Sequence, residues 1–315
     1  KPDPLWSRGL GDVYKRQGEI RKNAKDMDLF QAVAGSDEIY PDGISINEAL
    51  SQMTTLADSE KPFFLAVGIL RPHLPFGAPQ KYHVLYEDVT LPATAHPSKP
   101  SGKTTWHGSG EFMKYNRWGR NPNSDATFAL DVRKAYAACV SYADAQVGKL
   151  LSRLEQLGQR ENTIVVLWGD HGWHLGEHAI WGKHSLFEES LHSPMIISAP
   201  TVKKPGKPAN AMVETLDIYP TLCDLAGLTA PKQLDGESLV PILNDPSVGG
   251  HSAIAYSSRA QTIRTETHRL ILHRDGFAEL YDHSKPAAET KNIAQANQKL
   301  VSELSRQLKQ RLAQE

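Results

Sequence analysis

The stretch from Thr163 to Lys183, TIVVLWGDHGWHLGEHAIWGK, constrains the fold of this chain most. Its first six residues form a short apolar run rich in β-branched side chains, which is typical of a strand covered on both faces. Gly169 and Gly172 allow a sharp turn after that strand, so Asp170 and His171 should stand at its carboxyl end. Open α/β sheets gather functional side chains at this edge. The pattern therefore predicts an α/β fold with a chemical site at Asp170 and His171.

Segments typical of strands and helices alternate along the chain from residue 18. Residues 45–57 and 132–157 are predicted helices, the second because apolar residues recur every three or four positions before Gly158. Residues 63–69 and 195–198 are predicted buried strands, and residues 82–125 show little periodicity. This alternation favours a largely parallel sheet flanked by helices. We expect residues 18–236 to form most of a large α/β domain.

The pattern changes after residue 236. Residues 253–257, 262–265, 269–273 and 279–281 read as short antiparallel strands with polar turns between them. Leu300, Leu304, Leu308 and Leu312 then place one apolar stripe on a terminal helix. We expect residues 237–315 to form a smaller α+β subdomain, and the alternative is that the last helix packs on the main sheet.

The charge balance and hydropathy narrow the classes of partner. The sequence has 35 basic and 36 acidic side chains, which gives no indication of a nucleic-acid or membrane-surface partner. No apolar run approaches the roughly 20 residues that a membrane-spanning helix needs. The two cysteines, Cys139 and Cys223, lie on apolar faces of predicted helices and are expected to be core residues.

Four segments, in order along the chain, resemble the type I sulfatase family, and within it the iduronate-2-sulfatase-like branch. Asp-His-Gly at 170–172, Leu-Gly-Glu-His at 175–178 and Trp-Gly-Lys at 181–183 are similar to the family's second metal-binding segment. The segments PFFLAVGILRPHLPF (62–76), YAACVSYADAQVGKLL (136–151) and VETLDIYPTLCDLAGL (213–228) resemble other parts of its large domain. The resemblance implies an alkaline-phosphatase-like fold and a hydrolase of sugar sulfate esters, with a sulfated carbohydrate as substrate.

The resemblance also assigns roles to individual residues. Asp170 and His171 would be two ligands of a Ca²⁺ ion, although a helix cap and a hydrogen-bonded core histidine are the structural alternatives. Lys183 would contact the sulfate, where a fixed ammonium stabilises charge that grows in the transition state. His73 would protonate the leaving group from a loop with two prolines. The residues expected to line the substrate pocket are His184, His192 and Arg264.

The nucleophile of the family has no counterpart in this sequence. Sulfatases make formylglycine from the Cys or Ser of C-x-P-S-R or S-x-P-S-R, and neither cysteine stands in such a motif. Ser98-Lys99-Pro100-Ser101 lacks the arginine. Residues 1–17, KPDPLWSRGLGDVYKRQ, resemble a translated sequencing adapter, and an ordinary disordered leader is the alternative. We therefore expect an N-terminally truncated fragment that is inactive alone, from an exported enzyme whose formylglycine and further metal ligands lie in the missing part.

Other interpretations stay open. His174-Leu175-Gly176-Glu177-His178 matches H-x-x-E-H, a zinc signature that requires a continuous helix. Two flanking glycines favour a loop instead. The alternative functions are a phosphodiesterase or phosphonate hydrolase of the alkaline phosphatase superfamily, and a non-catalytic protein that binds sulfated glycans. The sequence does not indicate an oligomeric state.

Overall fold

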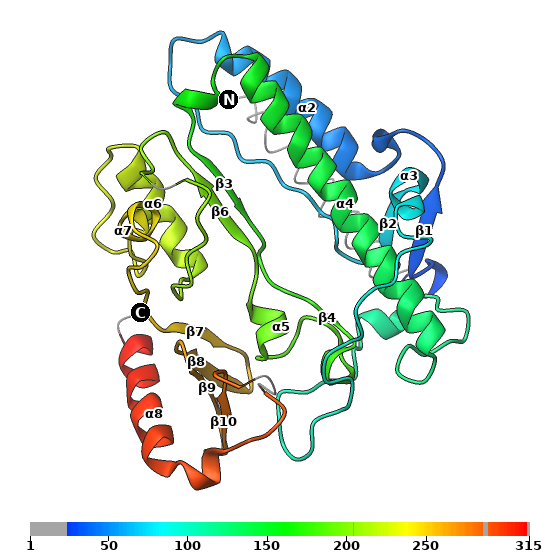
Figure 1. Cartoon of the computed structure of the whole chain (residues 1–315), viewed down its shortest axis with the longest axis vertical. Coiled ribbons are helices and arrows are strands. Elements are labelled where there is room, and N and C mark those ends of the chain that lie inside the picture. The colour runs from blue at the N-terminus through cyan, green and yellow to red at the C-terminus, as the bar shows by residue number, and fades with distance from the viewer. Residues whose placement is uncertain (1–23, 204, 286–288, 314–315) are drawn as a thin grey trace, which may run out of the picture. The chain divides into compact units, whose positions relative to one another are not determined.

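The computed structural model describes residues 24–203, 205–285 and 289–313 (Figure 1). The leader predicted for residues 1–17 lies outside this range. The chain divides into two compact units, of which the first comprises residues 1–93 and 109–159 and the second residues 94–108 and 160–315. The predicted boundary between residues 236 and 237 stays a prediction. None of the described helices is both long and apolar enough to cross a membrane.

Two long helices and a parallel strand pair form the first unit. Strand β1 (Phe30–Val33) pairs in parallel with β2 (Phe76–Pro79). Helix α2 (Pro41–Ala57) begins with a proline, which is well suited to a first turn that needs no N–H donor. Helix α4 (Ala126–Gln156) packs along α2, β2 and the short helix α3 (Gln80–Val84) (Figure 1). The 3₁₀ turns are η1 (Ala24–Asp26), η2 (Asp37–Ile39) and η3 (Phe112–Lys114).

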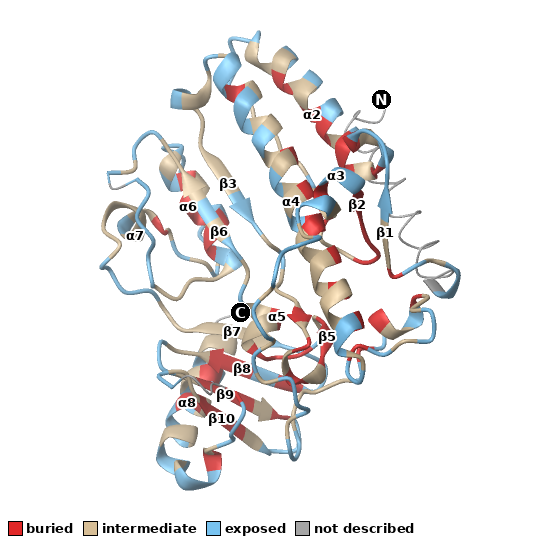
Figure 2. Cartoon of the chain, turned by 45° about the vertical axis from the view of Figure 1, so that its right-hand side comes forward, coloured by how far each residue is buried: buried red, intermediate tan, exposed pale blue. Residues whose placement is uncertain are grey.

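Local signals set both ends of α4. The Asp125 carboxylate caps its start by accepting a 2.9 Å hydrogen bond from the Phe128 N–H. Gly158 follows its end with a φ of 68°, which is favourable for glycine. One face is buried at three- and four-residue spacing, by Phe128, Val132, Ala135, Cys139 and Tyr142 (Figure 2). The predicted helix is confirmed.

Buried polar groups join these helices. The Asp37 carboxylate is buried and pairs with Lys81 at 2.8 Å and Lys149 at 2.6 Å. Burial alone would raise the pKa of Asp37, but the two ammonium groups outweigh it and hold that pKa well below its usual value. The Tyr142 hydroxyl donates to the Asp37 carbonyl at 2.8 Å and accepts from the Gly43 N–H at 2.7 Å. Helix α4 is thereby held against the start of α2.

A segment predicted as a buried strand does not pair. Residues 63–69 form no strand within the described chain, and Phe64 is 80% exposed. An apolar, β-branched run becomes a strand only where another strand supplies its hydrogen bonds, and local pattern alone does not guarantee one. The prediction of a buried strand at this place is wrong.

The second unit begins with an antiparallel strand pair. Strand β3 (Val165–Trp168) pairs with β6 (Met195–Ser198), Val165 opposite Ser198. The connection between them holds β4 (His174–Leu175), η5 (Glu177–Ala179), β5 (Trp181–Gly182) and the four-residue helix α5 (Glu188–Leu191). Because this connection contains no long crossover helix, the chain returns in the opposite direction. A parallel arrangement therefore holds for β1 and β2 but not for β3 and β6.

An antiparallel sheet covered by one helix forms the C-terminal part of this unit. Its strand order is β10 (Ala278–Asp282), β9 (His268–His273), β8 (Ala260–Arg264) and β7 (Ala253–Tyr256). Helix α8 (Gln298–Leu312) buries Leu304 and Leu308 against β8 and β9 (Figure 2). The predicted strands and terminal helix are confirmed, and α8 packs on this small sheet. The remaining elements are α6 (Ile218–Leu225), α7 (Val240–Asn244), η4 (Arg160–Asn162), η6 (Thr215–Asp217) and η7 (Ala294–Ala296).

Candidate functional site

The turn after β3 places Asp170 and His171 at the carboxyl end of that strand. The Gly172 N–H donates to the Ser190 carbonyl at 2.8 Å, which ties the turn to helix α5. A Cβ atom on Gly172 would lie 2.2 Å from the Glu189 carbonyl oxygen. Only glycine permits this close approach of two backbone segments. The position of the Asp-His pair therefore depends on Gly172.

The two side chains form a small donor set. The Asp170 side chain is 87% exposed, and its Oδ2 lies 3.7 Å from His171 Nε2. His171 Nδ1 lies 2.7 Å from the Gly172 carbonyl oxygen, which can only accept, so Nδ1 carries the hydrogen. The lone pair of Nε2 is then available on the side of the carboxylate. The carboxylate oxygen and the imidazole nitrogen could fill two coordination positions of a metal ion. Because Ca²⁺ takes six to eight ligands, this pair alone would not complete a calcium site.

Lys183 returns to this turn through the β4–β5 hairpin, in which His174 pairs with Gly182. Its Nζ lies 5.5 Å from the centre of the Trp173 ring, within range of a cation–π interaction. The centres of the Trp173 and His171 rings are 6.4 Å apart. The Trp173 ring thus lies between Lys183 and His171. The structure places the predicted residues Asp170, His171 and Lys183 around this ring.

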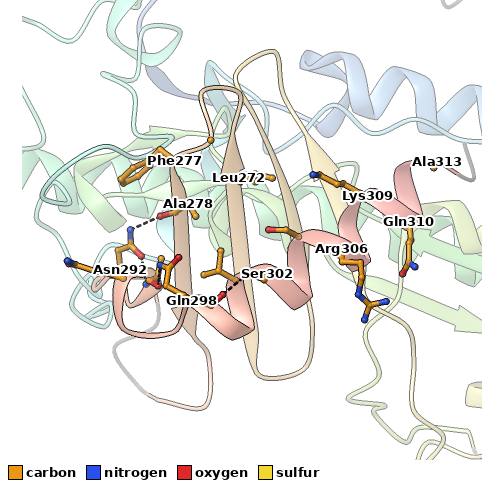
Figure 3. Close-up of a pocket in the computed structure, with 15 residues that line it drawn as sticks. Leu272, Phe277, Ala278, Asn292, Gln298, Ser302, Arg306, Lys309, Gln310 and Ala313 are labelled. Carbon is orange, nitrogen blue, oxygen red and sulfur yellow. Dashed lines mark hydrogen bonds between the residues drawn. The ribbon is translucent and has the colours of Figure 1, made fainter.

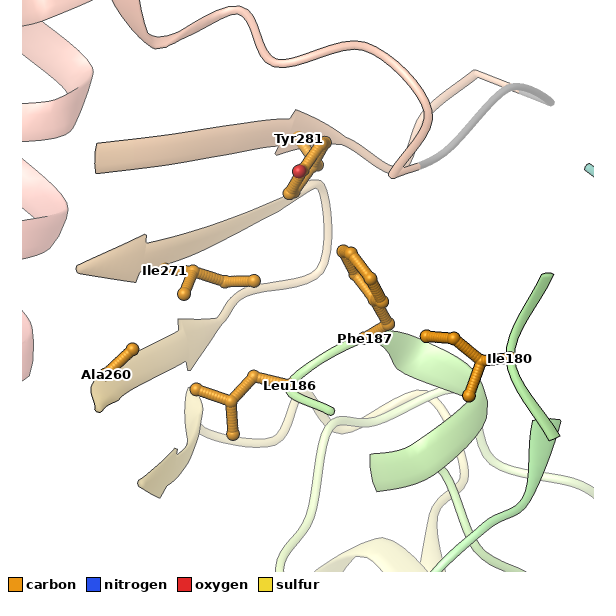
Figure 4. Close-up of a cluster of buried hydrophobic side chains, with 6 residues drawn as sticks. All are labelled: Ile180, Leu186, Phe187, Ala260, Ile271 and Tyr281. Atoms are coloured by element: carbon orange, nitrogen blue, oxygen red, sulfur yellow. The ribbon is translucent and has the colours of Figure 1, made fainter. Parts of the chain in front are cut away.

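Apolar packing fixes the loop that carries Lys183. Ile180, Leu186 and Phe187 come from this loop and are buried (Figure 4). They pack on the small sheet, against Ala260, Ile271 and Tyr281 (Figure 4). Fully burying a side chain of this size contributes about 1.5–3 kcal/mol, so the loop is held firmly at both sides of Lys183.

His73 lies in the first unit, in the loop before β2. The Arg71 N–H donates to the Asp42 carboxylate at 3.0 Å, and the Arg71 guanidinium donates to the His73 carbonyl at 3.1 Å. His73 Nδ1 lies 2.8 Å from the Leu74 carbonyl oxygen, so this nitrogen carries the hydrogen. Nε2 lies 3.7 Å from the Glu111 carboxylate. The ring is therefore oriented within its own unit, as a proton donor requires.

The three residues predicted to line the substrate pocket have different surroundings. His184 is exposed, and its ring centre lies 6.1 Å from that of His107. The His192 side chain is 77% exposed and Nδ1 lies 3.7 Å from Glu188. The Arg264 side chain is only 11% exposed, and its Nε pairs with Glu188 at 3.2 Å. Two of the three are thus exposed to solvent, whereas Arg264 is held by a carboxylate.

Sequence reasoning missed the buried ion network around that carboxylate. Arg269 pairs with Glu188 and, at 2.5 Å, with Glu289. His283 also lies 3.1 Å from Glu289. Arg269 is 81 residues from Glu188 along the chain, so no local pattern indicates the pairing. The network joins the loop before β6 to the small sheet.

The H-x-x-E-H segment is not a helix. Gly176 has a φ of 112° between β4 and η5, and His178 has a φ of 55°. Glu177 accepts a 2.7 Å hydrogen bond from the Leu175 N–H. The alternative of a helical zinc motif is therefore excluded at this segment, and the predicted preference for a loop is confirmed. Even so, the rings of His174 and His178 lie 5.9 Å apart.

Both cysteines belong to the core, as predicted. Cys139 is fully buried, and burial raises the pKa of its thiol to about 12. Cys223 is 9% exposed. A neutral thiol enclosed in apolar surroundings is a poor nucleophile, so Cys139 is not placed for attack on an ester.

A groove in the C-terminal region is chemically different from this site. It has a volume of about 1150 Å³ and lies beside α8, with Leu272, Phe277 and Ala278 among its lining residues (Figure 3). Arg306 and Lys309 supply its positive charge (Figure 3). The described lining contains no histidine or carboxylate and none of the predicted site residues. We therefore place the candidate chemistry at the end of β3.

Comparisons with known proteins show which protein families this chain matches. A family model described as Sulfatase matches residues 7–228, and one described as N-sulphoglucosamine sulphohydrolase, C-terminal, matches residues 176–315. A sulfatase of Formosa agariphila is 31% identical over 298 residues, covering 92% of this chain and 56% of that protein. Iduronate 2-sulfatase of Homo sapiens is 32% identical over 256 residues, covering 68% and 44%. The chain spans about half the length of these two relatives.

A solved structure has the same fold. The phosphonate monoester hydrolase of Agrobacterium radiobacter superposes with a TM-score of 0.79 over 98% of this chain and 69% of that one. The sequence identity is 22%, so this similarity concerns the fold alone. The alkaline-phosphatase-like α/β class predicted from the sequence is confirmed.

Proposed function

Because the chain belongs to the sulfatase family, we propose that it supplies the end-of-β3 part of a sulfuric ester hydrolase that acts on sulfated sugars. The observation that carries the proposal is the Asp170-His171 turn, to which the β4–β5 hairpin returns Lys183. The sugar substrate is supported by the similarity to iduronate 2-sulfatase and to the sulphoglucosamine sulphohydrolase model. Export from the cytoplasm is part of the same proposal.

We propose that Asp170 and His171 bind Ca²⁺. The carboxylate is exposed, and the hydrogen bond at His171 Nδ1 leaves the other ring nitrogen free to coordinate. A bound Ca²⁺ would hold the sulfate and partly neutralise its charge. Two ligands do not fill its shell, and the described clusters of three or more possible ligands include neither residue. Further oxygen ligands are therefore part of the proposal.

In this function Lys183 would hold the sulfate from the side of the Trp173 ring. Its ammonium would face oxygens that gain negative charge as the ester bond breaks, so it stabilises the transition state more than the bound ester. In its imidazolium form His73 would deliver the Nε2 proton to the departing sugar oxygen and keep its Nδ1 hydrogen on the Leu74 carbonyl, so that the neutral ring remains. The nucleophile would be a formylglycine, a role that we assign to no residue of this sequence.

The test requires an enzyme that unites this chain with the segment carrying the nucleophile motif. We expect such an enzyme to hydrolyse sulfate esters and the chain alone to be inactive. Lys183→Ala should lower kcat/KM by about 10²–10³-fold, as expected for loss of a transition-state charge contact. Lys291→Ala, a change of an exposed lysine with no proposed role, is the matched control. Near-normal turnover in Lys183→Ala would remove this lysine from the mechanism.

The same assay separates the alternative functions. Faster hydrolysis of a phosphonate monoester than of a sulfate ester would favour the phosphonate hydrolase, whose fold the chain shares. Binding of sulfated oligosaccharides without turnover of either ester would favour a non-catalytic glycan-binding protein. Either outcome would overturn the sulfatase proposal.

A further inference from the structure

The Asp42 carboxylate is buried at the start of helix α2 and binds the backbone of a distant segment. Asp42 is 3% exposed. Its Oδ1 accepts from the Leu70 N–H at 2.8 Å, and its Oδ2 accepts from the Arg71 N–H at 3.0 Å. Hydrogen bonds to a carboxylate are stronger than those between neutral groups. Because each oxygen receives one N–H, the carboxylate fixes the backbone just before His73.

The backbone around Asp42 is itself held in place. The Gly43 N–H donates to the Tyr142 hydroxyl on helix α4 at 2.7 Å. A Cβ atom on Gly43 would lie 2.2 Å from the Asp37 carbonyl oxygen, so the start of α2 is in close contact with η2. Side chains carried on packed helices hold their partners more precisely than side chains on loops. Asp42 is therefore a firm support for the segment that it binds.

The Arg71 side chain spans the loop that contains His73. Arg71 is 8% exposed. Its guanidinium donates from Nε to the Gly77 carbonyl at 2.5 Å and from Nη1 to the His73 carbonyl at 3.1 Å. Its Cζ lies 5.4 Å from the centre of the Tyr40 ring. The planar guanidinium presents its donors in a fixed geometry, which a lysine ammonium does not. The bonds of Asp42 and Arg71 thus fix the loop at its start, its middle and its end.

These contacts determine where the His73 ring lies. The His73 N–H donates to the Leu70 carbonyl at 2.9 Å, and the His73 carbonyl accepts from Arg71. The ring Nδ1 lies 2.8 Å from the Leu74 carbonyl oxygen. Because the backbone on both sides of the ring is bonded, a movement of Leu70 or Arg71 would displace Nε2, the nitrogen that would transfer the proton.

We propose that Asp42 is a positioning residue for His73 in the hydrolysis of sugar sulfates. The inference rests on the proposed function, in which His73 is the proton donor. Asp42 acts through the backbone of Leu70 and Arg71 and not through contact with the substrate. A misplacement of about 1 Å costs about 10²-fold in rate, so the loss of one Asp42 bond slows proton transfer without removing the donor.

The first test compares two esters in the enzyme that unites this chain with the nucleophile segment. A sugar sulfate has a poor leaving group and needs the proton, whereas a nitrophenyl sulfate leaves as a stable phenolate without it. The amide of Asp42→Asn can accept from only one of the two N–H groups. We expect Asp42→Asn to lower kcat/KM about 10–100-fold for the sugar sulfate and less than about 3-fold for the nitrophenyl sulfate. Arg71→Lys should give the same pattern.

Two controls separate positioning from general damage. Asp58→Asn changes an exposed aspartate at the other end of α2 and should leave both rates unchanged. His73→Gln should lower the sugar sulfate rate by about 10²–10⁴-fold, and Asp42→Asn added to it should have little further effect. Equal losses with both esters in Asp42→Asn, or additive losses in the double variant, would overturn the proposal.

A second test needs no enzymatic activity and uses the full chain with ¹⁵N-labelled histidine. The His73 ring signals are identified by their absence from the spectrum of His73→Gln. At a pH where the ring is neutral, we expect a single tautomer with the hydrogen on Nδ1 in wild type and in Asp58→Asn, and both tautomers in Asp42→Asn. An unchanged His73 tautomer in Asp42→Asn would overturn the positioning role. A united enzyme without sulfatase activity would instead contradict the proposed function, so the two failures are distinguishable.

Discussion

His251 should make the stability of the second unit depend on pH. Its Nε2 lies 2.9 Å from Asp217, and its Nδ1 lies 3.5 Å from Glu214. The Arg311 guanidinium pairs with Glu214 at 2.5 Å and also faces the ring. The hydrogen bond to Asp217 outweighs the opposing effect of burial and raises the pKa of His251 to about 9. The protonated imidazole is therefore strongly favoured by folding.

The size of the effect follows from the difference between folded and unfolded pKa values. An unfolded histidine has a pKa of about 6.5, so the difference is about 2.5 units, or about 3 kcal/mol at 1.36 kcal/mol per unit. The side chain is 22% exposed, so solvent screens this interaction only in part. Because the folded pKa is raised, the contribution is complete below about pH 6.5 and is lost as pH rises through about 9.

The contribution of His251 to the free energy of unfolding can be measured by urea unfolding of wild type and His251→Gln at about pH 6 and about pH 9.5. We expect the stability advantage of wild type to shrink by about 2–3 kcal/mol between the two pH values. His268→Gln, which changes a histidine whose Nδ1 lies 2.9 Å from the Thr267 hydroxyl, is the matched control. A wild-type advantage that stays constant for His251→Gln would refute the reasoning, because no proton would then be coupled to folding at this residue.

Two further predictions concern the packing that positions the site. Tyr142→Phe should destabilise the first unit by about 1–3 kcal/mol in urea unfolding, because it removes the acceptor of the buried Gly43 N–H and one of two donors to the Asp37 carbonyl. Tyr136→Phe on the same helix is the control, and an equal loss there would contradict the explanation. Phe187→Ala should cost about 3–5 kcal/mol as a buried cavity, measured by thermal unfolding, and a loss below about 1 kcal/mol would count against the packing in Figure 4.

Local sequence patterns predicted those elements whose signals lie within the element. Helix α4 has its cap at Asp125, its stop at Gly158 and a continuous apolar stripe between them. Strand β3 and the turn after it were predicted because Gly169 and Gly172 follow a β-branched run. The same holds for the four short strands and the terminal leucine stripe of the C-terminal region.

Features that depend on distant partners could not be predicted in this way. Residues 63–69 have a strand-like pattern, but pairing is a property of two segments, and a single segment does not reveal its partner. The direction of β6 depends on the form of its connection to β3. Arg264 was expected in a pocket, yet its ion pair with Glu188 spans 76 residues of sequence.

The segment 94–108 belongs to the second unit although residues on both sides of it belong to the first. It supplies the His96 and Trp106 groups that clamp His178, and the Thr105 hydroxyl that accepts from the Leu186 N–H at 3.0 Å. During translation this segment is synthesised before α4. Its hydrogen-bond partners lie in residues 178–186 and are synthesised only later. A gene fragment that starts at residue 160 would lack these contacts. Because each unit consists of two separate stretches of sequence, a single break in the chain cannot separate one complete unit from the other.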